Sequence, residues 1–181
     1  IENLKTEAWS NDKSKNRFHQ TVCRRLDQKE EYKELYSWFH LCLKAVIKHL
    51  KLNCDNLQIT LSWGNKAYES EELPLHKHPN SYISGVFYLT DSNSRTIFRQ
   101  FNTWSSFNGM SYSNFNPSPH TTLSYLHNPV KGQVLLFPSS LSHSVEPNKE
   151  TEERFTISFN AFPSGKIGDF GSLTGLHLII K

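Results

Sequence analysis

The residues of this sequence most suited to chemistry are histidines, and two of them are separated by a single residue. His76 and His78 stand in the stretch LPLHKHPNSYISGVFYL, residues 73–89. In an extended chain, residues i and i+2 point to the same face, so the two imidazoles could reach one metal ion. Imidazole suits iron, zinc, copper and nickel. Taken alone, the pair is equally compatible with two polar side chains at a solvated strand end.

A third histidine and an arginine follow later in the chain. His143 lies in VLLFPSSLSHSVEPN, after a strand-like segment and a proline turn, and Arg154 comes eleven residues further on. The segment RFTISFNAF alternates between a polar face (Arg154, Thr156, Ser158 and Asn160) and an apolar face (Phe155, Ile157, Phe159 and Ala161). A polar face headed by arginine indicates a lined cavity, in which the guanidinium could bind a carboxylate with help from a hydroxyl. The alternative is a surface arginine that begins a strand.

The rest of the chain supplies the elements that must position these side chains. Apolar residues recur at three- and four-residue steps over residues 27–52 and predict one long helix. After residue 56 the pattern is that of short strands bounded by Gly, Pro, Asn and Ser; we expect them at 57–65, 81–90, 95–101, 132–140, 154–162 and 172–181. This order predicts a single, mainly β domain over residues 1–181, an antiparallel sandwich or barrel with the helix packed outside.

One long connection, residues 101–128, is rich in Ser, Asn and aromatic residues. Long connections in compact domains are usually functional or mobile. Its aromatic side chains could line a substrate pocket, or they could pack onto the sheet beneath them. His120 and His127, which lie in it, are interpreted as surface residues.

Composition narrows the possible partners. The formal net charge is +3, with a sequence pI near 8.7, and this mild excess lacks the basic stripe expected of a nucleic-acid-binding protein. The only Arg pair, in residues 23–26 (CRRL), is interpreted as part of a solvated helical face. Three cysteines without metal spacing indicate a reducing, cytoplasmic compartment. No apolar run has the roughly 18–20 residues of a membrane span, so we expect no membrane partner.

Taken together, these motifs resemble a known family. The strings SWGN, HKHPNSYISGVFYL, FPSSLSHSVEP and RFTISFN resemble the iron(II)/2-oxoglutarate-dependent dioxygenases, and more narrowly a bacterial and phage family of 2-oxoglutarate oxygenases. The resemblance extends over residues 57–178. It implies a double-stranded β-helix, or jelly roll, as the core, with the helix of residues 27–52 outside.

The resemblance assigns roles to individual residues. His76, His78 and His143 match the metal-ligand positions. Arg154 matches the arginine that grips the distal carboxylate of 2-oxoglutarate, and the family implies Thr156 and Tyr88 as its helpers. Ser158 and Asn160 continue the same face and are expected to touch the substrate or to support the ligands.

The position of His78 departs from the usual pattern, in which an Asp or Glu stands there. A carboxylate cancels one charge of Fe(II), whereas a third imidazole does not. We therefore expect the dianionic cosubstrate to contribute more than usual to metal retention. The other reading is that His78 does not ligate and a water molecule takes its place.

The implied function is an Fe(II)- and 2-oxoglutarate-dependent dioxygenase that uses O2, releases succinate and CO2, and hydroxylates a small-molecule or peptidyl substrate. Two alternatives remain open at this stage. One is a cupin-type metalloprotein that does not use 2-oxoglutarate, although Tyr82 and Ile83 stand where a common cupin has a glutamate after its HxH pair. The other is a jelly-roll binding module without catalysis.

Overall fold

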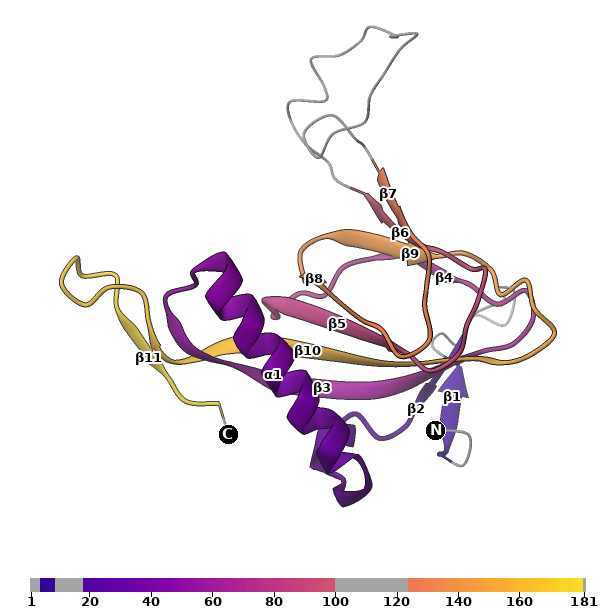
Figure 1. The fold of residues 1–181 in the computed structure, drawn as a ribbon, viewed down its shortest axis with the longest axis horizontal. Helices are drawn as coiled ribbons and strands as arrows, with labels where there is room; N and C mark the ends of the chain where they lie inside the picture. Colours follow the sequence, from indigo (N-terminus) through magenta and orange to yellow (C-terminus); the bar gives the residue numbers. More distant parts are fainter. Residues whose placement is uncertain (1–3, 9–17, 100–123, 181) are drawn as a thin grey trace, which may run out of the picture.

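The computed structural model describes residues 4–8, 18–99 and 124–180. Within these residues the protein is mainly β, with two antiparallel sheets and one α-helix (Figure 1). The predicted mainly β, antiparallel character is confirmed.

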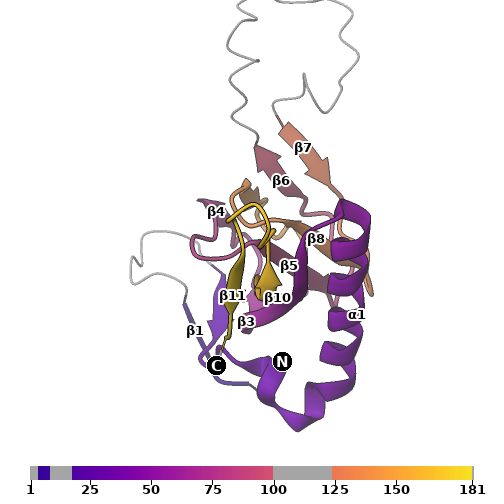
Figure 2. The ribbon, with the colours of Figure 1, turned by 90° about the vertical axis from the view of Figure 1, so that its left-hand side faces the viewer.

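The larger sheet is built around one long strand. It contains β1 (Thr6–Ala8), β2 (His19–Thr21), β3 (Cys54–Ala67), β5 (Ile83–Tyr88), β8 (Val134–Pro138), β10 (Arg154–Ile167) and β11 (Leu176–Leu178). The order is β1-β2-β3-β10-β5-β8, and β11 pairs with the far end of β10 in a hairpin that extends beyond the rest of the sheet (Figures 1 and 2). β10 is paired with β3 on one side and with β5 on the other, and residues on both of its faces are buried.

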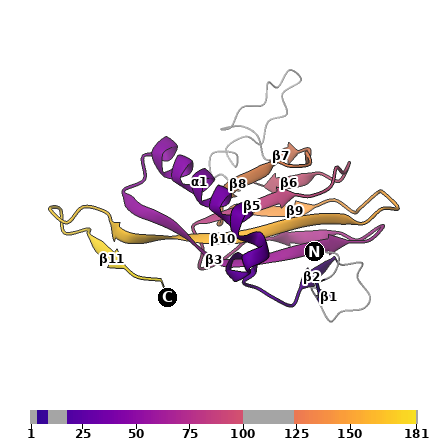
Figure 3. The same cartoon turned by 60° about the horizontal axis from the view of Figure 1, so that its bottom comes forward.

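The smaller sheet covers one of these faces. It contains β4 (Leu73–His76), β6 (Thr96–Arg99), β7 (Ser124–His127) and β9 (Ser142–Val145), in the order β4-β9-β6-β7. Figure 3 shows strands β6, β7 and β9 of the smaller sheet to one side of the long strands β3 and β10 of the larger sheet. The inner faces of the two sheets are therefore where side chains from distant parts of the sequence can meet.

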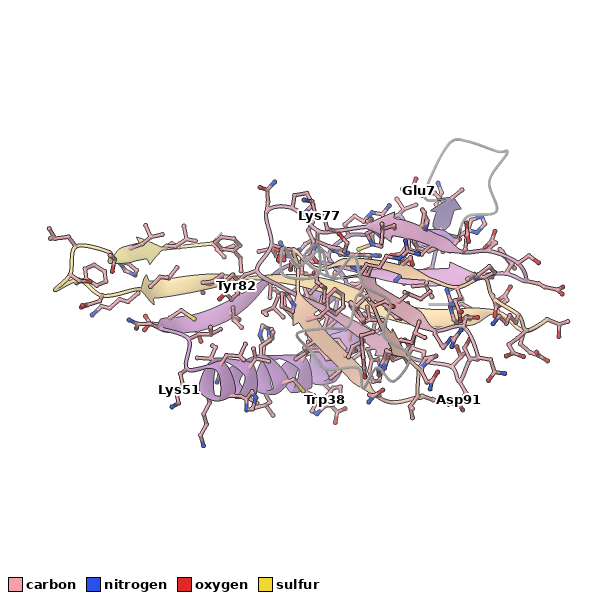
Figure 4. All side chains as sticks on the ribbon, turned by 90° about the horizontal axis from the view of Figure 1, so that it is seen from above. Glu7, Trp38, Lys51, Lys77, Tyr82 and Asp91 are labelled. Atoms are coloured by element: carbon pink, nitrogen blue, oxygen red, sulfur yellow. The ribbon has the colours of Figure 1, made fainter. Side chains whose placement is uncertain are left out.

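The helix α1 (Lys33–Leu50) packs on the outer face of the larger sheet (Figures 1 and 4). Its buried residues Tyr36, Phe39 and Leu43 recur at three- and four-residue steps, which places them on one side of the helix. The ring of Phe39 stacks on Phe159 of β10 at a centroid distance of 4.8 Å. The helix ends at Lys51, which adopts the left-handed conformation.

The helix is shorter than the predicted 27–52. Residues Leu26–Gln28 (η1) and Glu30–Tyr32 (η2) form two separate 3-10 turns instead. The backbone nitrogen of Asp27 in η1 donates a hydrogen bond to the hydroxyl of Ser62 in β3, so this segment is bound to the sheet. None of the described helices is both long enough and apolar enough to cross a bilayer.

Several short strands were not predicted. β1 and β2 lie in the segment before the helix, and β2 pairs with β3. β4 and β9 contain the histidines themselves. Most of the aromatic connection predicted over residues 101–128 lies outside the described residues, apart from β7 and the turn after it. His127, expected at the surface, is buried instead, with its ring stacked on Tyr88 at 5.8 Å and its Nε2 donating to Gln133.

Candidate active site

Three histidines meet on the inner side of the smaller sheet. His76 ends β4 and pairs in register with His143 of β9, while His78 lies two residues beyond the end of β4. The ring centroids of His76 and His143 are 4.2 Å apart, and that of His78 is 5.1 Å from each of them. One ring nitrogen from each residue lies within 4.8 Å of the other two. The predicted convergence of these three side chains is confirmed.

Hydrogen bonds set the tautomer of each imidazole. His76 donates from Nδ1 to the carbonyl oxygen of Pro74 (2.8 Å), His143 to that of Leu141 (3.0 Å), and His78 to Oδ1 of Asn160 (2.8 Å). Since an oxygen acceptor requires the proton on Nδ1, the lone pair of each neutral ring lies on Nε2. The Nε2 atoms of His76 and His78 are 3.2 Å apart. Two facing lone pairs repel each other, and a shared cation removes that repulsion.

The same environment keeps the imidazoles neutral. Burial lowers the pKa of His143 to about 3 and that of His78 to about 4, and in both cases the nearby His76 adds to the effect. Burial also lowers the pKa of His76. Neutral imidazole is the form that ligates metals, so the site needs no deprotonation at neutral pH before a metal ion binds.

The orientation of His78 depends on a short polar chain. Oδ1 of Asn160 accepts from His78 and also from the hydroxyl of Ser84 at 2.9 Å. The Ser84 hydroxyl in turn shares a 2.8 Å hydrogen bond with Ser139. The expectation that Asn160 supports a ligand position agrees with these contacts, whereas Ser158 bonds to Asn65 and not to any of the three histidines.

A buried positive charge lies deeper between the sheets. Arg154 begins β10 and is 9% exposed. Its one hydrogen bond among the described residues runs from Nη1 to the carbonyl oxygen of Glu146, at 3.4 Å. None of the ion pairs within the described ranges includes Arg154. Burial lowers its pKa to about 10, so the guanidinium is still charged at neutral pH.

A buried arginine without a carboxylate is costly unless an anion joins it. Two hydroxyl groups stand beside this position. Tyr88 is 4% exposed, and its hydroxyl shares a 3.1 Å hydrogen bond with Thr96. Burial raises the pKa of Tyr88, so it remains a neutral donor. The hydroxyl of Thr156 accepts from Nδ2 of Asn65 at 3.0 Å, which leaves its proton available to an anion.

Strand register explains why these residues share a face. Thr156 of β10 stands opposite Asn65 of β3 on one side and Tyr88 of β5 on the other. The next inward-facing row places Ser158 opposite Trp63. The Trp63 ring lies over His78 at 5.8 Å, with 22° between the planes. The row nearest Arg154 therefore offers hydroxyl and amide groups, and the following row offers an aromatic wall beside the histidines.

The three histidines, Arg154 and the polar face of β10 border one cavity of about 370 Å³. The predicted site residues that line it are His76, His78, Tyr88, His143, Arg154 and Thr156. Asn65 and Trp63 had no predicted role, although both share the alternation of the strand predicted over residues 57–65. Gln20 and Arg24 also line the cavity from the segment before the helix. The prediction that the Arg pair of residues 23–26 lies on a solvated helical face is wrong, because Arg25 forms a β-bridge with Ser62 and the segment runs beside β3. No sequence pattern in that segment indicated a role in the site.

Comparison with known families yields one match, over the part of the chain that contains this site. Residues 61–160, more than half of the chain, match the family model described as "Putative 2OG-Fe(II) oxygenase". The matched region includes all six predicted site residues. No curated protein matches the chain.

Several solved structures share the fold at low sequence identity. A prolyl-4-hydroxylase from Pseudomonas putida is 13% identical with a TM-score of 0.58, over 89% of this chain and 79% of its own. HygX from Streptomyces hygroscopicus, with nickel and 2-oxoglutarate bound, is 15% identical with a TM-score of 0.57, over 90% and 74%. The epimerase SnoN of nogalamycin biosynthesis, described as non-heme and α-ketoglutarate-dependent, is 11% identical with a TM-score of 0.64, over 92% and 71%.

Proposed function

The chain belongs to the family of 2OG-Fe(II) oxygenases, and we propose that it hydroxylates its substrate with an iron ion held by His76, His78 and His143. One observation carries this proposal: three imidazoles with a ring nitrogen each within 4.8 Å of the others share a cavity with the buried guanidinium of Arg154, which has no ion-pair partner among the described residues. A metal site alone would not need the arginine, and an anion site alone would not need the histidines.

The three histidines fit iron(II) by donor type, and the pair His76 and His78 also fits it by spacing. Imidazole is a common ligand of Fe(II), and metal–nitrogen bonds of about 2.1 Å place neighbouring ligand atoms about 3.0–3.4 Å apart. The 3.2 Å between the Nε2 atoms of His76 and His78 lies in this range. When bound, iron, 2-oxoglutarate and O2 supply the oxidation, which converts 2-oxoglutarate to succinate and CO2 and adds one oxygen atom to the substrate.

Arg154 is proposed to hold the distal carboxylate of 2-oxoglutarate. A guanidinium can donate two parallel hydrogen bonds to a carboxylate. Thr156 can donate its hydroxyl proton to the same group, and Tyr88 lies beside it with a neutral phenol. Burial of the arginine keeps competing water away, and the low dielectric around it strengthens its attraction to the carboxylate.

The substitution of imidazole for the usual carboxylate changes the charge of the site. Three neutral histidines leave both positive charges of iron(II) uncompensated until 2-oxoglutarate, a dianion, binds. We therefore expect 2-oxoglutarate and the metal to increase each other's affinity more strongly than in a site with two histidines and one carboxylate.

The architecture and the partner are part of the same proposal. The two facing sheets would form the double-stranded β-helix of a single oxygenase domain, with its core over residues 57–178. A cavity of about 370 Å³ is near the lower limit for small-molecule sites. Since it must also hold the cosubstrate, it admits a small molecule or one side chain of a peptide.

Two measurements test the proposed function. Protein loaded anaerobically with iron(II) should retain about one equivalent, and exposure to O2 with 2-oxoglutarate should yield succinate. With the right substrate, the product should be heavier by one oxygen atom. Metal retention without any affinity for 2-oxoglutarate would instead indicate the cupin alternative, and less than about a tenth of an equivalent of metal would indicate a binding module.

The role of His78 can be tested separately from that of the other two histidines. His78→Asp would restore the usual carboxylate, and we expect it to retain iron and succinate formation. His78→Ala should weaken iron binding, while His143→Ala should abolish it. Unchanged iron affinity in His78→Ala would show that this imidazole is not a ligand.

A further inference from the structure

Arg24, at the open end of the cavity, bears on the identity of the substrate. We propose that the substrate is an organic anion with an apolar body, either a carboxylate or a phosphate ester, and that Arg24 binds its charged group. This inference rests on the proposed function.

The backbone fixes Arg24 beside the cavity. Its carbonyl oxygen accepts a 2.9 Å hydrogen bond from the backbone nitrogen of Ser62 in β3, and the neighbouring Arg25 forms a β-bridge with the same residue. Arg24 thereby lies next to Leu61 and Trp63, which line the cavity from β3. The Arg pair of residues 23–26, interpreted from the sequence as part of a solvated helical face, thus supplies part of the site.

Exposure shows which end of the cavity Arg24 occupies. Arg154 and Tyr88 are 9% and 4% exposed and mark the closed end. Leu61 is 45% exposed, and the Arg24 side chain is 36% exposed. A substrate that enters from solvent can therefore reach Arg24 at the open end, and Arg154 at the closed end is left to the cosubstrate.

The charge of the lining favours an anion. The described residues that border the cavity include three basic ones, Arg24, Lys77 and Arg154. This set of lining residues contains no Asp or Glu. With three neutral imidazoles, the charges of iron(II) and of dianionic 2-oxoglutarate cancel, so Arg154 leaves the loaded site with one net positive charge. A protein with an Asp or Glu ligand would not have this surplus. The histidine at position 78 in place of an Asp or Glu and the position of Arg24 thus both favour a negatively charged substrate.

Lys77 adds to this potential from a distance. It lies on the loop after β4, at the edge of the molecule opposite the helix, where Glu7 of β1 also lies (Figure 4). Long-range attraction of this kind would steer an anion toward the opening, whereas direct recognition would be the task of Arg24.

Arg24 can accept another partner. Its Nη2 donates to Oε1 of Glu7 at 2.9 Å, but the Glu7 side chain is 56% exposed, and such pairs contribute little. Its Nη1 is buried and has no hydrogen-bond partner among the described residues. A buried donor without an acceptor is unfavourable, and an anion reached by a small rotation of the guanidinium would supply one.

The remaining walls explain the apolar body of the substrate. Leu61, Trp63, Val86 and Phe137 also border the cavity. None of them offers a charged group, and the indole nitrogen of Trp63 already donates to Oδ1 of Asn65 at 3.0 Å. An apolar or aromatic moiety would fill this space, with its anionic end at Arg24.

The test compares charged and neutral probes of one shape. Anaerobic protein with iron(II) and saturating 2-oxoglutarate is titrated by calorimetry with 3-phenylpropionate, phenyl phosphate and the neutral 3-phenylpropionamide. We expect one of the two anions to bind about tenfold more tightly than the amide, as for a charge-assisted hydrogen bond. The anion that binds more tightly identifies the class of substrate. Saturation with 2-oxoglutarate keeps the probes away from Arg154.

Two variants assign the preference to one side chain. Arg24→Gln should reduce the preference for the anion to about twofold or less. Arg25→Gln is the matched control, because the Arg25 side chain is equally exposed at 36% but pairs with Asp27 and does not line the cavity; it should keep the full preference. Thermal unfolding of both variants shows that the fold is intact.

The outcomes separate this inference from the proposed function. If 2-oxoglutarate itself fails to bind, the proposed function is wrong and the inference falls with it. If 2-oxoglutarate binds but the wild type treats all three probes alike, or binds none of them, the inference alone is overturned. An undiminished preference in Arg24→Gln would overturn it as well.

Discussion

The two faces of β10 are both buried, yet they are built from opposite kinds of residue. The outer face carries Phe155, Ile157, Phe159 and Ala161, each at most 7% exposed, and the inner face carries Arg154, Thr156, Ser158 and Asn160, at 7–9%. A strand with one solvated face would show the same alternation of apolar and polar residues. The alternation alone therefore does not distinguish water from a lined cavity.

What covers each face makes the difference. The outer face is filled by α1, whose Phe39 is fully buried against Phe159, and gains its stability from apolar contact. The inner face bonds to Asn65, His78 and other polar side chains, and it borders open space. The outer face therefore stabilises the fold, whereas the inner face keeps polar groups ready for a metal ion and an anion.

The largest effect on stability is expected on the outer face. Phe159→Ala should lower the free energy of unfolding by about 3–5 kcal/mol, because it removes a fully buried ring and leaves a cavity. Urea denaturation measures this. Ser158→Ala, one residue away on the inner face, is the control and should cost less than about 1 kcal/mol. Equal losses in the two variants would contradict the division of roles between the faces.

Arg154 should show the opposite behaviour. Arg154→Met removes a buried charge, so the unfolding free energy of the metal-free protein should stay the same or rise by about 1 kcal/mol. Its affinity for 2-oxoglutarate should fall by at least about 30-fold, since about 2–5 kcal/mol of charge pairing is lost. Calorimetry with 2-oxoglutarate and metal analysis check both, and iron should remain bound. Undiminished affinity for 2-oxoglutarate would remove the basis of the cosubstrate pocket.

Asn160 should have an intermediate effect, limited to the metal. Asn160→Ala removes the acceptor for Nδ1 of His78, and we expect iron affinity to fall by about 10- to 100-fold. Competition with a chelator measures this affinity. Ser158→Ala again serves as the control, because its hydroxyl bonds to Asn65. If both variants bind iron equally, the hydrogen bond from His78 to Asn160 does not position the ligand.

The smallest effect is a pH dependence at the edge of the outer face. Burial of Asp27 acts to raise its pKa, but hydrogen bonds from Arg25 and Ser62 outweigh it and hold the pKa below its usual value of 3.8. Because the folded-state pKa is lowered, this stabilisation is present above about pH 4 and is lost as the pH falls below it.

Asp27→Asn should therefore cost about 1 kcal/mol at pH 7 and progressively less in acid. Urea denaturation at pH 7 and pH 3 measures the difference between the two proteins. A gap that stays constant over this range would show that the charge of Asp27 does not contribute.

Residue types and short spacings were enough to predict much of this site. The alternation of β10 follows from the two-residue period of a strand, and the helical face of Tyr36, Phe39 and Leu43 follows from its three- and four-residue steps. The distant meeting of His78 with His143 was predicted only through resemblance to a family, because no local period links residues so far apart in sequence.

Other features could not be read from the sequence. His127 was expected at the surface, but it follows a connection whose path no local pattern specifies. The pairing of β3 with β10 shifts by one residue between Asn160 and Ala161. Because of this shift, Asn65 faces inward although Ile59, an even number of residues earlier in the same strand, is paired with Ala161 of the outer face.

By itself, the sequence determined the chemistry of the donors: imidazoles, a guanidinium, and a strand with one polar and one apolar face. These are properties of side chains and of the backbone period, which neighbours in the chain already define. The tertiary structure alone decided that both faces of that strand are buried and that Arg24 lies at the opening of the cavity. Those outcomes depend on strand register and on which sheet covers which face, and both are settled by contacts between residues far apart in the chain.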